Sequence, residues 1–459
     1  MRRPVVAVIG GGVTGLGAVV TIEEAAGDQI RTVLFESSTR LGGVIRGGKL
    51  GGVYVEDGPD SFIERDGYML EWCRRLGIED RLTEPAIFGA LIYDGRAIRP
   101  MPAGSLFGIP PSAHAARRSG LVSFRGALRA LGDHVLPGPL KGPDVSVESY
   151  LTGRLGREVV ERMVDPLLAG ARSGDVGSLS LAAALPDIDR IARSRRGVMR
   201  GIRRGARSTG AELPRFRSFD KGMPVLVRAL SDHCRRADVR VGEAVTRIER
   251  SGKTFVVRSG TRRLRADAII IATPAPHALG LLTPVLPDAV PILATVEHAS
   301  VAVVSLLYAQ GRDALPESGS GVLIPSSAER VVSACTFYSR KWPVSDPGGD
   351  ALVLRAVVAR DPAGVLDHDD RSLSKVVDGD LREVLGLRAP AASARVTRWS
   401  EALPRYEVGH LDRMRELDAI MATAPGIALA GSSYGGPGIP DCLRSGSAAA
   451  TRILSHVLG

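Results

Sequence analysis

The chain has 459 residues and a formal net charge of +10, with 44% hydrophobic and 24% charged residues. This composition excludes fibrous and wholly disordered proteins, and the length predicts two or three globular domains. Of the 60 basic residues, 54 are Arg. An arginine-rich surface favours bidentate contacts with carboxylates or phosphates, although a nucleotide bias of the genome would explain the excess equally well.

The four cysteines, Cys73, Cys234, Cys335 and Cys442, are widely separated and show no metal-ligand spacing. We therefore expect reduced thiols and no metal site. No signal peptide is visible, and no apolar run reaches the roughly 18 residues that would span a bilayer. These features predict a cytoplasmic protein and leave open peripheral contact with a membrane or with a partner enzyme.

The N-terminal segment has the pattern of a β-α-β unit. An apolar run at residues 5–9 leads into Gly10-x-Gly12-x-x-Gly15, a helix is expected to about residue 26, and a strand follows at 32–35. Glu36 ends that strand, 21 residues after Gly15, where a carboxylate can accept hydrogen bonds from a ribose. The pattern predicts dinucleotide binding, and the alternative is a purely structural glycine turn.

The residues after the strand indicate which dinucleotide is bound. A carboxylate at Glu36 would repel the 2′-phosphate of NADP. Gly42 and Gly43 follow closely and would let a second stretch of backbone approach the cofactor. This second contact favours an extended FAD over NAD.

The rest of the chain predicts an α/β protein with insertions. Strand patterns recur at 268–273, at several segments between 296 and 402, and at 427–430, and a C-terminal helix is expected from about residue 441. We predict a Rossmann-like nucleotide-binding domain in three parts (1–85, 209–282 and 412–459), a strand-rich substrate domain in two parts (86–103 and 283–411), and a helical insertion at 104–208. Seven arginines fall between 193 and 207. A solvated face or loop is the favoured interpretation of this run, ahead of contact with anionic lipid or with a protein.

The chain resembles the porphyrinogen oxidases of haem synthesis, within the amine oxidase superfamily. The motifs that carry the resemblance are Glu36-x3-Arg40-x-Gly42-Gly43, EDGPDSF at 56–62, GIPP at 108–111, RSGLVS at 118–123, PLLAG at 166–170, the segment 399–410 and YGGPGIPDC at 434–442. They extend over most of the sequence and are far more specific than the glycine loop alone.

The resemblance implies an FAD-dependent oxidase that removes six electrons from coproporphyrinogen III and reduces O2 to H2O2. Protoporphyrinogen IX oxidation, another FAD oxidase or desaturase activity, and a flavin-binding protein without turnover are the alternatives. By analogy, FAD contacts are expected at Gly10, Gly11, Gly12, Val13, Thr14, Gly15, Glu36, Ser37, Arg40, Gly42, Gly43, Gly58, Pro59, Asp60, Ser61, Val245, Trp399, Ile439, Pro440 and Asp441. Non-covalent FAD is expected, because Cys442 is the one Cys or His at the flavin loops and should point into helix packing.

Substrate residues are predicted with less support. By analogy, the backbone carbonyl of Gly170 would face the macrocycle and stabilise developing positive charge. Arg172 stands where the family usually has an aromatic residue, and it could bind a substrate propionate or point to solvent. Arg96 lies on the predicted Asp-Gly hairpin turn and is a second candidate. Lys221, where relatives usually have Gly, is another departure and leaves room for a modified tetrapyrrole substrate.

Two rival functions have weaker patterns. Residues 431–435 match G-x-S-x-G, but a glycine-rich segment follows Ser433 where a hydrolase needs a helix, and the expected base would be His456 near the C-terminus. His298 and His410 are expected to be satisfied by hydrogen bonds rather than catalytic. Nucleic-acid binding is not expected, because the arginine run contains no aromatic residue.

Overall fold

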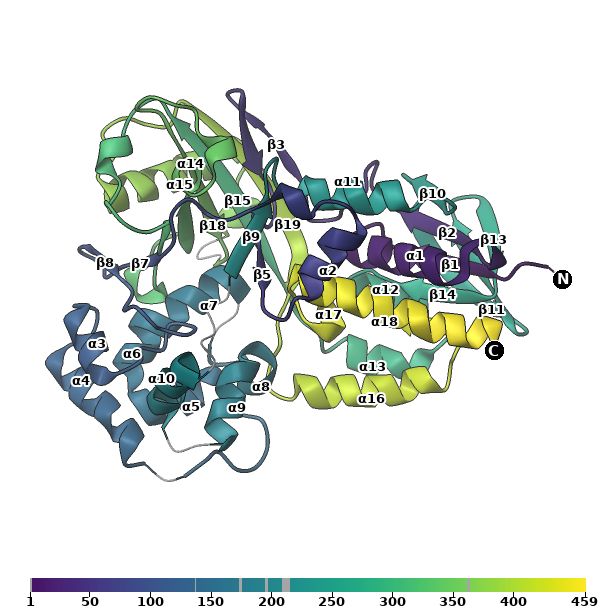
Figure 1. Ribbon diagram of the computed structural model, residues 1–459, viewed down its shortest axis with the longest axis horizontal. Helices are drawn as coiled ribbons and strands as arrows, with labels where there is room; N and C mark the ends of the chain where they lie inside the picture. The colour runs from purple at the N-terminus through teal and green to yellow at the C-terminus, as the bar shows by residue number, and fades with distance from the viewer. Residues whose placement is uncertain (1, 137, 173–175, 195–196, 209–214, 361–363) are drawn as a thin grey trace.

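A five-stranded parallel sheet forms the centre of one half of the molecule (Figure 1). The computed structural model describes residues 2–136, 138–172, 176–194, 197–208, 215–360 and 364–459. The strand order is β10 (Asp238–Val241), β2 (Arg31–Glu36), β1 (Val5–Ile9), β14 (Ala268–Ile271) and β20 (Ile427–Leu429). β1 and β14 are apolar at every position and buried throughout, as expected for a parallel sheet covered on both faces.

Helices from the two ends of the chain pack together on one face of this sheet. In Figure 1, α1 (Val13–Ala26) and α18 (Ile439–Leu458) run side by side. A Cβ added at Gly446 would lie 2.2 Å from the carbonyl oxygen of Thr14, so only glycine permits this approach. The opposite face is covered by the antiparallel strands β11 (Val245–Ser251), β12 (Thr254–Ser259) and β13 (Arg262–Ala266) and by α12 (Ala275–Leu282), α13 (Val290–Leu293) and α16 (His410–Ala422).

The second half of the molecule contains a seven-stranded sheet. Its order is β19 (Ser393–Pro404), β15 (His298–Tyr308), β18 (Leu352–Val358), β17 (Ala334–Phe337), β16 (Gly321–Leu323), β7 (Ala90–Tyr93) and β8 (Ile98–Pro100). One face packs against α15 (Asp370–Leu385), whose apolar side includes Leu373 and Val377. The other face is turned toward the functional site described below.

A group of helices between residues 113 and 208 has a hydrophobic core of its own. These helices are α3 (Ala113–Arg118), α4 (Phe124–Ala130), α5 (Val147–Leu155), α6 (Arg157–Val159), α7 (Asp165–Arg172), α8 (Leu181–Ala184), α9 (Pro186–Ser194) and α10 (Val198–Ser208). The buried carboxylate of Asp133 accepts hydrogen bonds from the backbone N–H groups of Val198 and Met199, both at 3.0 Å, and so ties the first turn of α10 to the end of α4. From here on we call residues 104–208 the helical insertion.

Several sequence predictions can be compared with these elements. The chain is an α/β protein, the 94–95 hairpin turn forms between β7 and β8, and α1 ends at Ala26 as expected. The C-terminal helix begins at Ile439, two residues earlier than predicted, because Gly438 and Asp441 form its N-terminal cap. Arg195 and Arg196 of the arginine run lie outside the described residues. No helix in the described part of the chain is long and apolar enough to cross a membrane.

Candidate functional site

The glycine loop after β1 has the geometry that its spacing predicts. Gly10 has φ of +109°, which favours glycine. A Cβ on Gly15 would lie 1.9 Å from the carbonyl oxygen of Gly10, so this position must be glycine for helix and strand to pack. At Gly12 the nearest atom to an added Cβ is the Cα of Gly43 at 4.0 Å. Gly12 therefore leaves open space above the loop, where a pyrophosphate could approach.

Among the described residues, no side chain caps the start of α1, which faces that space. Gly12 is the N-cap residue and provides no side-chain hydrogen bond, and the first turn, which begins at Val13 and Thr14, contains no acidic residue. The first backbone N–H groups of a helix carry partial positive charge and bind anions well. The residues present therefore fit a dinucleotide phosphate.

Glu36 lies at the carboxyl end of β2, beside the glycine loop. Its Oε2 accepts a hydrogen bond from the N–H of Gly11 at 2.7 Å, and its Oε1 accepts one from the N–H of Ser38 at 2.7 Å. The neighbouring Ser37 hydroxyl donates to Oε1 at 3.4 Å. These bonds aim the buried carboxylate at the loop, where it can also accept from a ribose hydroxyl.

A second loop, formed by residues 40–45, closes on the first. The N–H of Gly42 donates to the carbonyl of Gly11 at 2.8 Å, and the Arg40 guanidinium donates to the carbonyl of Gly43 at 2.7 Å. Burial lowers the pKa of Arg40, and the nearby Arg46 lowers it further. Arg40 thus holds the 40–45 loop in place through a hydrogen bond to its backbone.

Segment 242–245 lies beside these loops. The N–H of Glu243 donates to the Glu36 carbonyl at 2.9 Å, and the N–H of Gly242 donates to the carbonyl of Ser38 at 2.7 Å. Val245 begins β11 directly afterwards. The fold therefore brings Glu243, two residues before Val245, into contact with Glu36 from a distant part of the chain.

Trp399 is held against the start of the loop that contains Gly58, Pro59, Asp60 and Ser61. Its indole N–H donates to the carbonyl of Asp57 at 2.7 Å. The buried Asp57 carboxylate accepts from Arg46 at 2.6 Å and from Arg395 at 2.7 Å. Burial would raise the pKa of Asp57, but the bonds from the two arginines hold it below its usual value. Two guanidinium groups on one carboxylate leave a net positive charge beside Trp399.

Asp60 anchors the other end of this loop. Its carboxylate accepts hydrogen bonds from the Lys341 ammonium and the Trp342 indole N–H, both at 2.9 Å, and from the Ser61 hydroxyl at 2.9 Å. Burial would raise the pKa of Asp60, but Lys341 and then Arg355 hold it well below its usual value. Asp60 is thus an ionised carboxylate that anchors this loop to Lys341 and Trp342.

Glu56 is a residue of interest that the sequence analysis did not single out. Its side chain is buried, its Oε1 accepts the N–H of Met223 at 2.6 Å, and its Oε2 has no partner among the described residues. Burial raises the pKa of Glu56 to about 8. It borders a cavity of about 220 Å³ that Asp60 and Tyr338 also line. Its position directly before Asp57 and Gly58 in the EDGPDSF motif could have marked Glu56 as a site residue in the sequence.

The start of α18 lies close to α1. Ile439 and Pro440 form its first turn, and the Asp441 carboxylate accepts the N–H of Gly438 at 3.2 Å. The Cys442 thiol turns back toward the carbonyl of Gly436 at 3.9 Å, and burial raises its pKa to about 12. A buried thiol of this kind is a poor nucleophile. The helix α18 packs beside α1, the helix that follows the glycine loop, and the FAD contacts expected of Ile439, Pro440 and Asp441 stay predictions.

The described contacts do not test the predicted substrate residues. Gly170 and Arg172 fall in the last turn of α7, and their side-chain surroundings lie outside the described residues. Arg96 is exposed on the hairpin turn, where its N–H donates to Asp94 at 2.9 Å. The structure thus provides no positive support for Arg96 or Arg172.

The strand register reveals a continuous face of the seven-stranded sheet. One row of directly paired residues crosses all seven strands: Thr397, Val303, Val357, Ala334, Leu323, Ile92 and Arg99. Paired residues point to the same side of a sheet. The adjacent row on this side includes Arg395 and Arg355, which bind the 56–58 segment. At the other end, Ile92 and Leu323 pack into the helical insertion. Val357 and Ala334, between the two ends, remain partly exposed.

The G-x-S-x-G motif has a structural explanation. The Ser433 hydroxyl is fully buried, accepts the N–H of Ala275 at 3.0 Å and lies 2.9 Å from Nε2 of His298. The histidine beside the serine is therefore His298 rather than the predicted His456, because the chain folds β15 back onto this loop. His298 also bonds to the Val296 carbonyl through Nδ1 at 3.0 Å, as expected for a histidine satisfied by hydrogen bonds.

His410, unlike His298, is not held by hydrogen bonds at both ring nitrogens, which differs from the prediction for this residue. It stacks on Tyr406 with ring centroids 4.2 Å apart, and its Nδ1 is buried without a hydrogen-bond partner in the described residues. Burial, followed by the charge of Arg413, lowers its pKa to about 4. The prediction that hydrogen bonds satisfy His410 is therefore wrong for this ring nitrogen, because aromatic stacking holds the ring instead.

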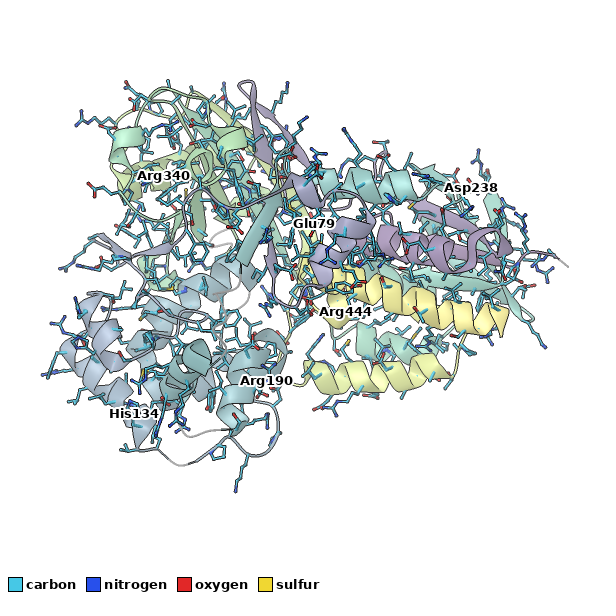
Figure 2. All side chains as sticks on the ribbon, viewed as in Figure 1. Glu79, His134, Arg190, Asp238, Arg340 and Arg444 are labelled. Carbon is cyan, nitrogen blue, oxygen red and sulfur yellow. The ribbon has the colours of Figure 1, made fainter. Side chains whose placement is uncertain are left out.

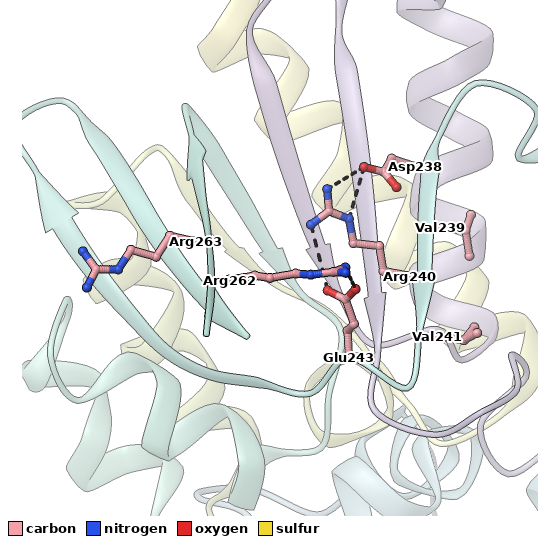
Figure 3. A pocket seen from close by; sticks show the side chains of 7 residues that line it. All are labelled: Asp238, Val239, Arg240, Val241, Glu243, Arg262 and Arg263. Carbon is pink, nitrogen blue, oxygen red and sulfur yellow. Dashed lines mark hydrogen bonds and ion pairs between the residues drawn. The ribbon is translucent and has the colours of Figure 1, made fainter. Parts of the chain in front are cut away.

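A larger open hollow of about 660 Å³ lies beside β10 (Figure 3). Arg240 bonds to Asp238 at 2.6 Å and lies 3.9 Å from Glu243, which Arg262 also contacts. Arg240 is thus paired with both acids, and Arg262 is paired with Glu243. The hollow is therefore a surface lined by ion pairs, whereas the space above Gly12 is lined by backbone.

Comparison with known proteins agrees with this geometry. The family described as flavin containing amine oxidoreductase matches residues 14–454. The chain is 32% identical to coproporphyrinogen III oxidase of Bacillus subtilis over 98% of both chains, and 34% identical to that of Mycobacterium bovis over 97% of this chain and 96% of the relative. A solved structure from Exiguobacterium, assigned provisionally as a protoporphyrinogen oxidase, superposes with a TM-score of 0.88 at 28% identity and covers 100% of this chain and 99% of its own.

Proposed function

The chain belongs to the family of flavin-containing amine oxidoreductases, and from this premise we propose that it oxidises coproporphyrinogen III to coproporphyrin III. The observation that carries the proposal is the full-length similarity to coproporphyrinogen III oxidases at 32–34% identity. In the balanced reaction, six electrons and six hydrogens leave the macrocycle, and three O2 are reduced to three H2O2.

FAD is the cofactor that this site fits. The open space at Gly12, the uncapped start of α1 and the Glu36 carboxylate suit its pyrophosphate and ribose. Trp399 and the Gly58–Ser61 loop, on the far side of the second glycine loop, would hold the ring end of an extended molecule. Bound FAD supplies the acceptor for each two-electron step. The protein orients the reactants and excludes water.

Non-covalent attachment of FAD is supported by the state of Cys442. Its buried thiol points to a backbone carbonyl and has a raised pKa, so it is poorly suited to form a thioether. Acid precipitation should release yellow FAD into the supernatant. Flavin that stays with the precipitated chain would contradict this part of the proposal.

The macrocycle would lie on the sheet face between the 56–58 segment and the helical insertion. Val357, Ala334 and Leu323 give this face a small, apolar and partly exposed floor that suits a flat tetrapyrrole. Arg99 ends the same row, with its guanidinium ion-paired to Asp94 and 41% of its side chain exposed. We therefore prefer Arg99 to Arg96 as the cation that meets a substrate propionate.

Steady-state kinetics on two substrates tests the function. Coproporphyrinogen has four propionates, and protoporphyrinogen has two, with vinyl groups at the other positions. A site that pairs four carboxylates would leave cations unpaired beside vinyl groups, so kcat/KM should be at least tenfold higher for coproporphyrinogen. Equal values, or a preference for protoporphyrinogen, would move the assignment to protoporphyrinogen oxidase.

Arg99→Ala and Arg96→Ala form a matched pair that tests the substrate face. Loss of a charge-assisted bond to a propionate should raise KM for coproporphyrinogen about tenfold in Arg99→Ala. Arg96→Ala, on the exposed turn of the same hairpin, should leave KM unchanged. A larger effect of Arg96→Ala would favour the original prediction from the sequence.

A further inference from the structure

Glu56 ends β4 (Val53–Glu56) and has a buried carboxyl group that no step of the proposed function uses. Only 1% of the residue is exposed. Its Oε1 accepts the N–H of Met223, and its Oε2 has no hydrogen-bond partner in the part of the chain that the structure describes. Because burial raises the pKa of Glu56 to about 8, the group is protonated at neutral pH, with the proton on Oε2. This O–H is therefore a buried donor that no described residue accepts.

The backbone of Glu56 is tied to both parts of the proposed site. The Arg355 guanidinium, which belongs to the sheet face proposed for the macrocycle, donates to the carbonyl of Glu56 at 3.1 Å. The Tyr338 hydroxyl accepts the N–H of Glu56 at 3.2 Å. The next carbonyl, that of Asp57, accepts the indole N–H of Trp399. Glu56 therefore lies between the substrate face and the loop that would hold the ring end of FAD.

The side chain of Glu56 borders the cavity of about 220 Å³, which extends from the interior to the surface. Glu56, Ser218 and Tyr338 are buried and form its inner part, whereas Asp220 and Val344 are exposed and form its outer part. A water molecule takes up about 30 Å³ in the liquid, so the cavity has room for a short chain of water molecules. The Oε2–H group thus has a polar route to solvent. We call this space the Glu56 cavity.

The Glu56 cavity lies at the boundary between the two halves of the molecule. The elements that line it include β6 (Leu82–Thr83), β9 (Arg215–Phe219), α14 (Tyr338–Lys341) and η8 (Pro343–Ser345). In Figure 1, β9 lies in the middle of the molecule, between the seven-stranded sheet and the cofactor-binding half. Figure 2 labels Arg340 of α14 in the first half and Glu79, three residues before β6, near the boundary. The cavity is therefore enclosed by segments from distant parts of the chain.

Several groups around the Glu56 carboxyl influence its charge. They are Tyr54, Asp60, Tyr338 and Arg355. Burial and the negative charge of Asp60 favour the protonated form of Glu56, whereas the Met223 N–H, the Tyr54 hydroxyl and Arg355 favour the ionised form. Burial has the largest effect. It also raises the pKa of Tyr54 and of Tyr338 above the ordinary value, so both hydroxyls stay neutral. Glu56 is thus the member of this group that changes its charge near neutral pH.

The proposed reaction needs a proton donor at this place. In each two-electron step one hydrogen leaves a carbon of the macrocycle as hydride, and a second leaves a pyrrole nitrogen as a proton. The hydride contains both electrons and one of the two hydrogens of H2O2. Reduction of O2 to H2O2 therefore requires one further proton, which a neutral carboxyl group can supply.

We propose that Glu56 supplies this proton and regains one from solvent through the Glu56 cavity. The Oε2–H bond breaks, the proton joins the reduced oxygen to complete H2O2, and a carboxylate remains. A proton from water in the cavity then forms the Oε2–H bond again, while the pyrrole proton leaves to solvent, so each step is balanced. The inference rests on O2 as the electron acceptor in the proposed function. It does not depend on which porphyrinogen is the substrate.

Reoxidation of the reduced holoenzyme by O2 tests this role without any porphyrinogen. Flavin absorbance in stopped flow gives the rate constant. The wild-type value should be constant below about pH 7 and should fall above pH 8, approaching tenfold per pH unit, because the donor is then ionised. Glu56→Gln should reoxidise at least tenfold more slowly at pH 7 and should lose this pH dependence. Asp220→Asn removes an exposed acid of the same cavity and should behave as the wild type does.

Infrared spectroscopy of the holoenzyme gives a second readout that needs no turnover. The wild type at about pH 6 should show the carbonyl band of a protonated carboxyl group, which shifts in D2O and disappears well above pH 8. The band should be missing in Glu56→Gln and present in Asp220→Asn. Flavin content and the melting temperature show that each variant is folded.

Several results would overturn the proposal. Equal reoxidation rates of the wild type and Glu56→Gln, or an alkaline decline that Glu56→Gln retains, would exclude Glu56 as the donor. A wild-type spectrum without the protonated carboxyl band at neutral pH would exclude it independently of any variant. None of these results changes the expected preference for coproporphyrinogen over protoporphyrinogen, so failure here and failure of the proposed function are distinguishable.

Discussion

The cofactor-binding half and the helical insertion differ in how their cores are assembled. In the cofactor-binding half, β1, β14 and β20 come from three distant parts of the chain, and helices from both ends pack on them. The core of the insertion is drawn mainly from one continuous stretch, with a few residues such as Ile92 added from the sheet. Both regions contain crowded glycines, such as Gly15 in the first and Gly108 in the second, but the second also exposes large apolar side chains on the outer side of α4.

This difference teaches where the chain tolerates change. At Gly15 and Gly446 an added methyl would collide with backbone that cannot move independently. On the outer side of α4, Phe124 and Leu128 are exposed and can change without disturbing the core. We therefore expect substitutions at the crowded glycines of the cofactor-binding half to alter stability and cofactor affinity, and substitutions at these exposed positions of α4 to alter neither.

The largest effect is expected for Gly15→Ala. The new Cβ would lie 1.9 Å from the Gly10 carbonyl oxygen, so the strand and helix must separate. We expect a loss of at least about 4 kcal/mol of stability and of bound flavin, measured by thermal unfolding and absorbance. Gly12→Ala is the matched control, because its Cβ meets only Gly43 at 4.0 Å. It should keep the apo-protein melting temperature but weaken FAD binding; an equally unstable Gly12→Ala would show that the loop is merely structural.

The next largest effect on stability is expected for Asp57→Asn. The change leaves Arg46 and Arg395 without their shared counter-ion and should cost about 2–3 kcal/mol at neutral pH. Because the folded pKa of Asp57 is depressed, its stabilisation is present above the unfolded pKa and is lost as pH falls through the folded pKa. Urea unfolding should therefore show the gap between wild type and variant closing below about pH 4. A gap independent of pH would mean that packing, not charge, is responsible.

Glu36→Ala should weaken FAD binding by about tenfold to a hundredfold, since a charge-assisted acceptor contributes about 1.5–3 kcal/mol. The variant also removes the acceptor for the N–H groups of Gly11 and Ser38, so the loop will be less ordered. Glu36→Gln keeps an acceptor for one of these two N–H groups, so its FAD affinity should lie between those of the wild type and Glu36→Ala. Titration of the apo-protein with FAD measures the affinities, and unchanged values would make Glu36 a structural acid only.

Glu56→Gln should change how the free energy of unfolding depends on pH, and should leave its value at low pH nearly unchanged. The folded pKa is raised from 4.5 to about 8, so the folded chain retains a proton that the unfolded chain releases. Wild-type stability attributable to Glu56 is thus full below about pH 4.5 and declines toward pH 8, by up to about 1.4 kcal/mol per pH unit. Urea unfolding at pH 5, 6.5 and 8 should show a flatter profile in the variant. The same steep decline in both proteins would contradict a neutral Glu56.

The smallest effect is expected on α4. Leu128→Asp should change stability by no more than about 0.5 kcal/mol, because the side chain is exposed and contributes to no core. Its FAD content and kcat should match those of the wild type. A clear loss of stability would show that α4 tolerates substitution no better than the cofactor-binding half does.

The sequence by itself determined the cofactor end of this protein. Continuous apolar strands, the Gly10–Gly15 spacing and Glu36 are local patterns, and each depends only on the backbone requirements of a β-α-β unit. For this reason the parallel strands and the geometry at Gly10, Gly12 and Gly15 agree with prediction. The family motifs extended the same inference to Trp399 and Val245, which the fold places beside Asp57 and near Glu36, respectively.

Only the tertiary structure decided what depends on pairing between distant segments. The register of seven strands puts Arg99 rather than Arg96 on the same side as Val357 and Ala334, and a shift of one residue would reverse this result. The raised pKa of Glu56 and the pairing of His298 with Ser433 arise from burial against segments over a hundred residues away. The exposure of Phe124, Leu128, Leu131 and Val135 was equally hidden, because their spacing is that of an ordinary buried helix face and only the fold shows which side is covered.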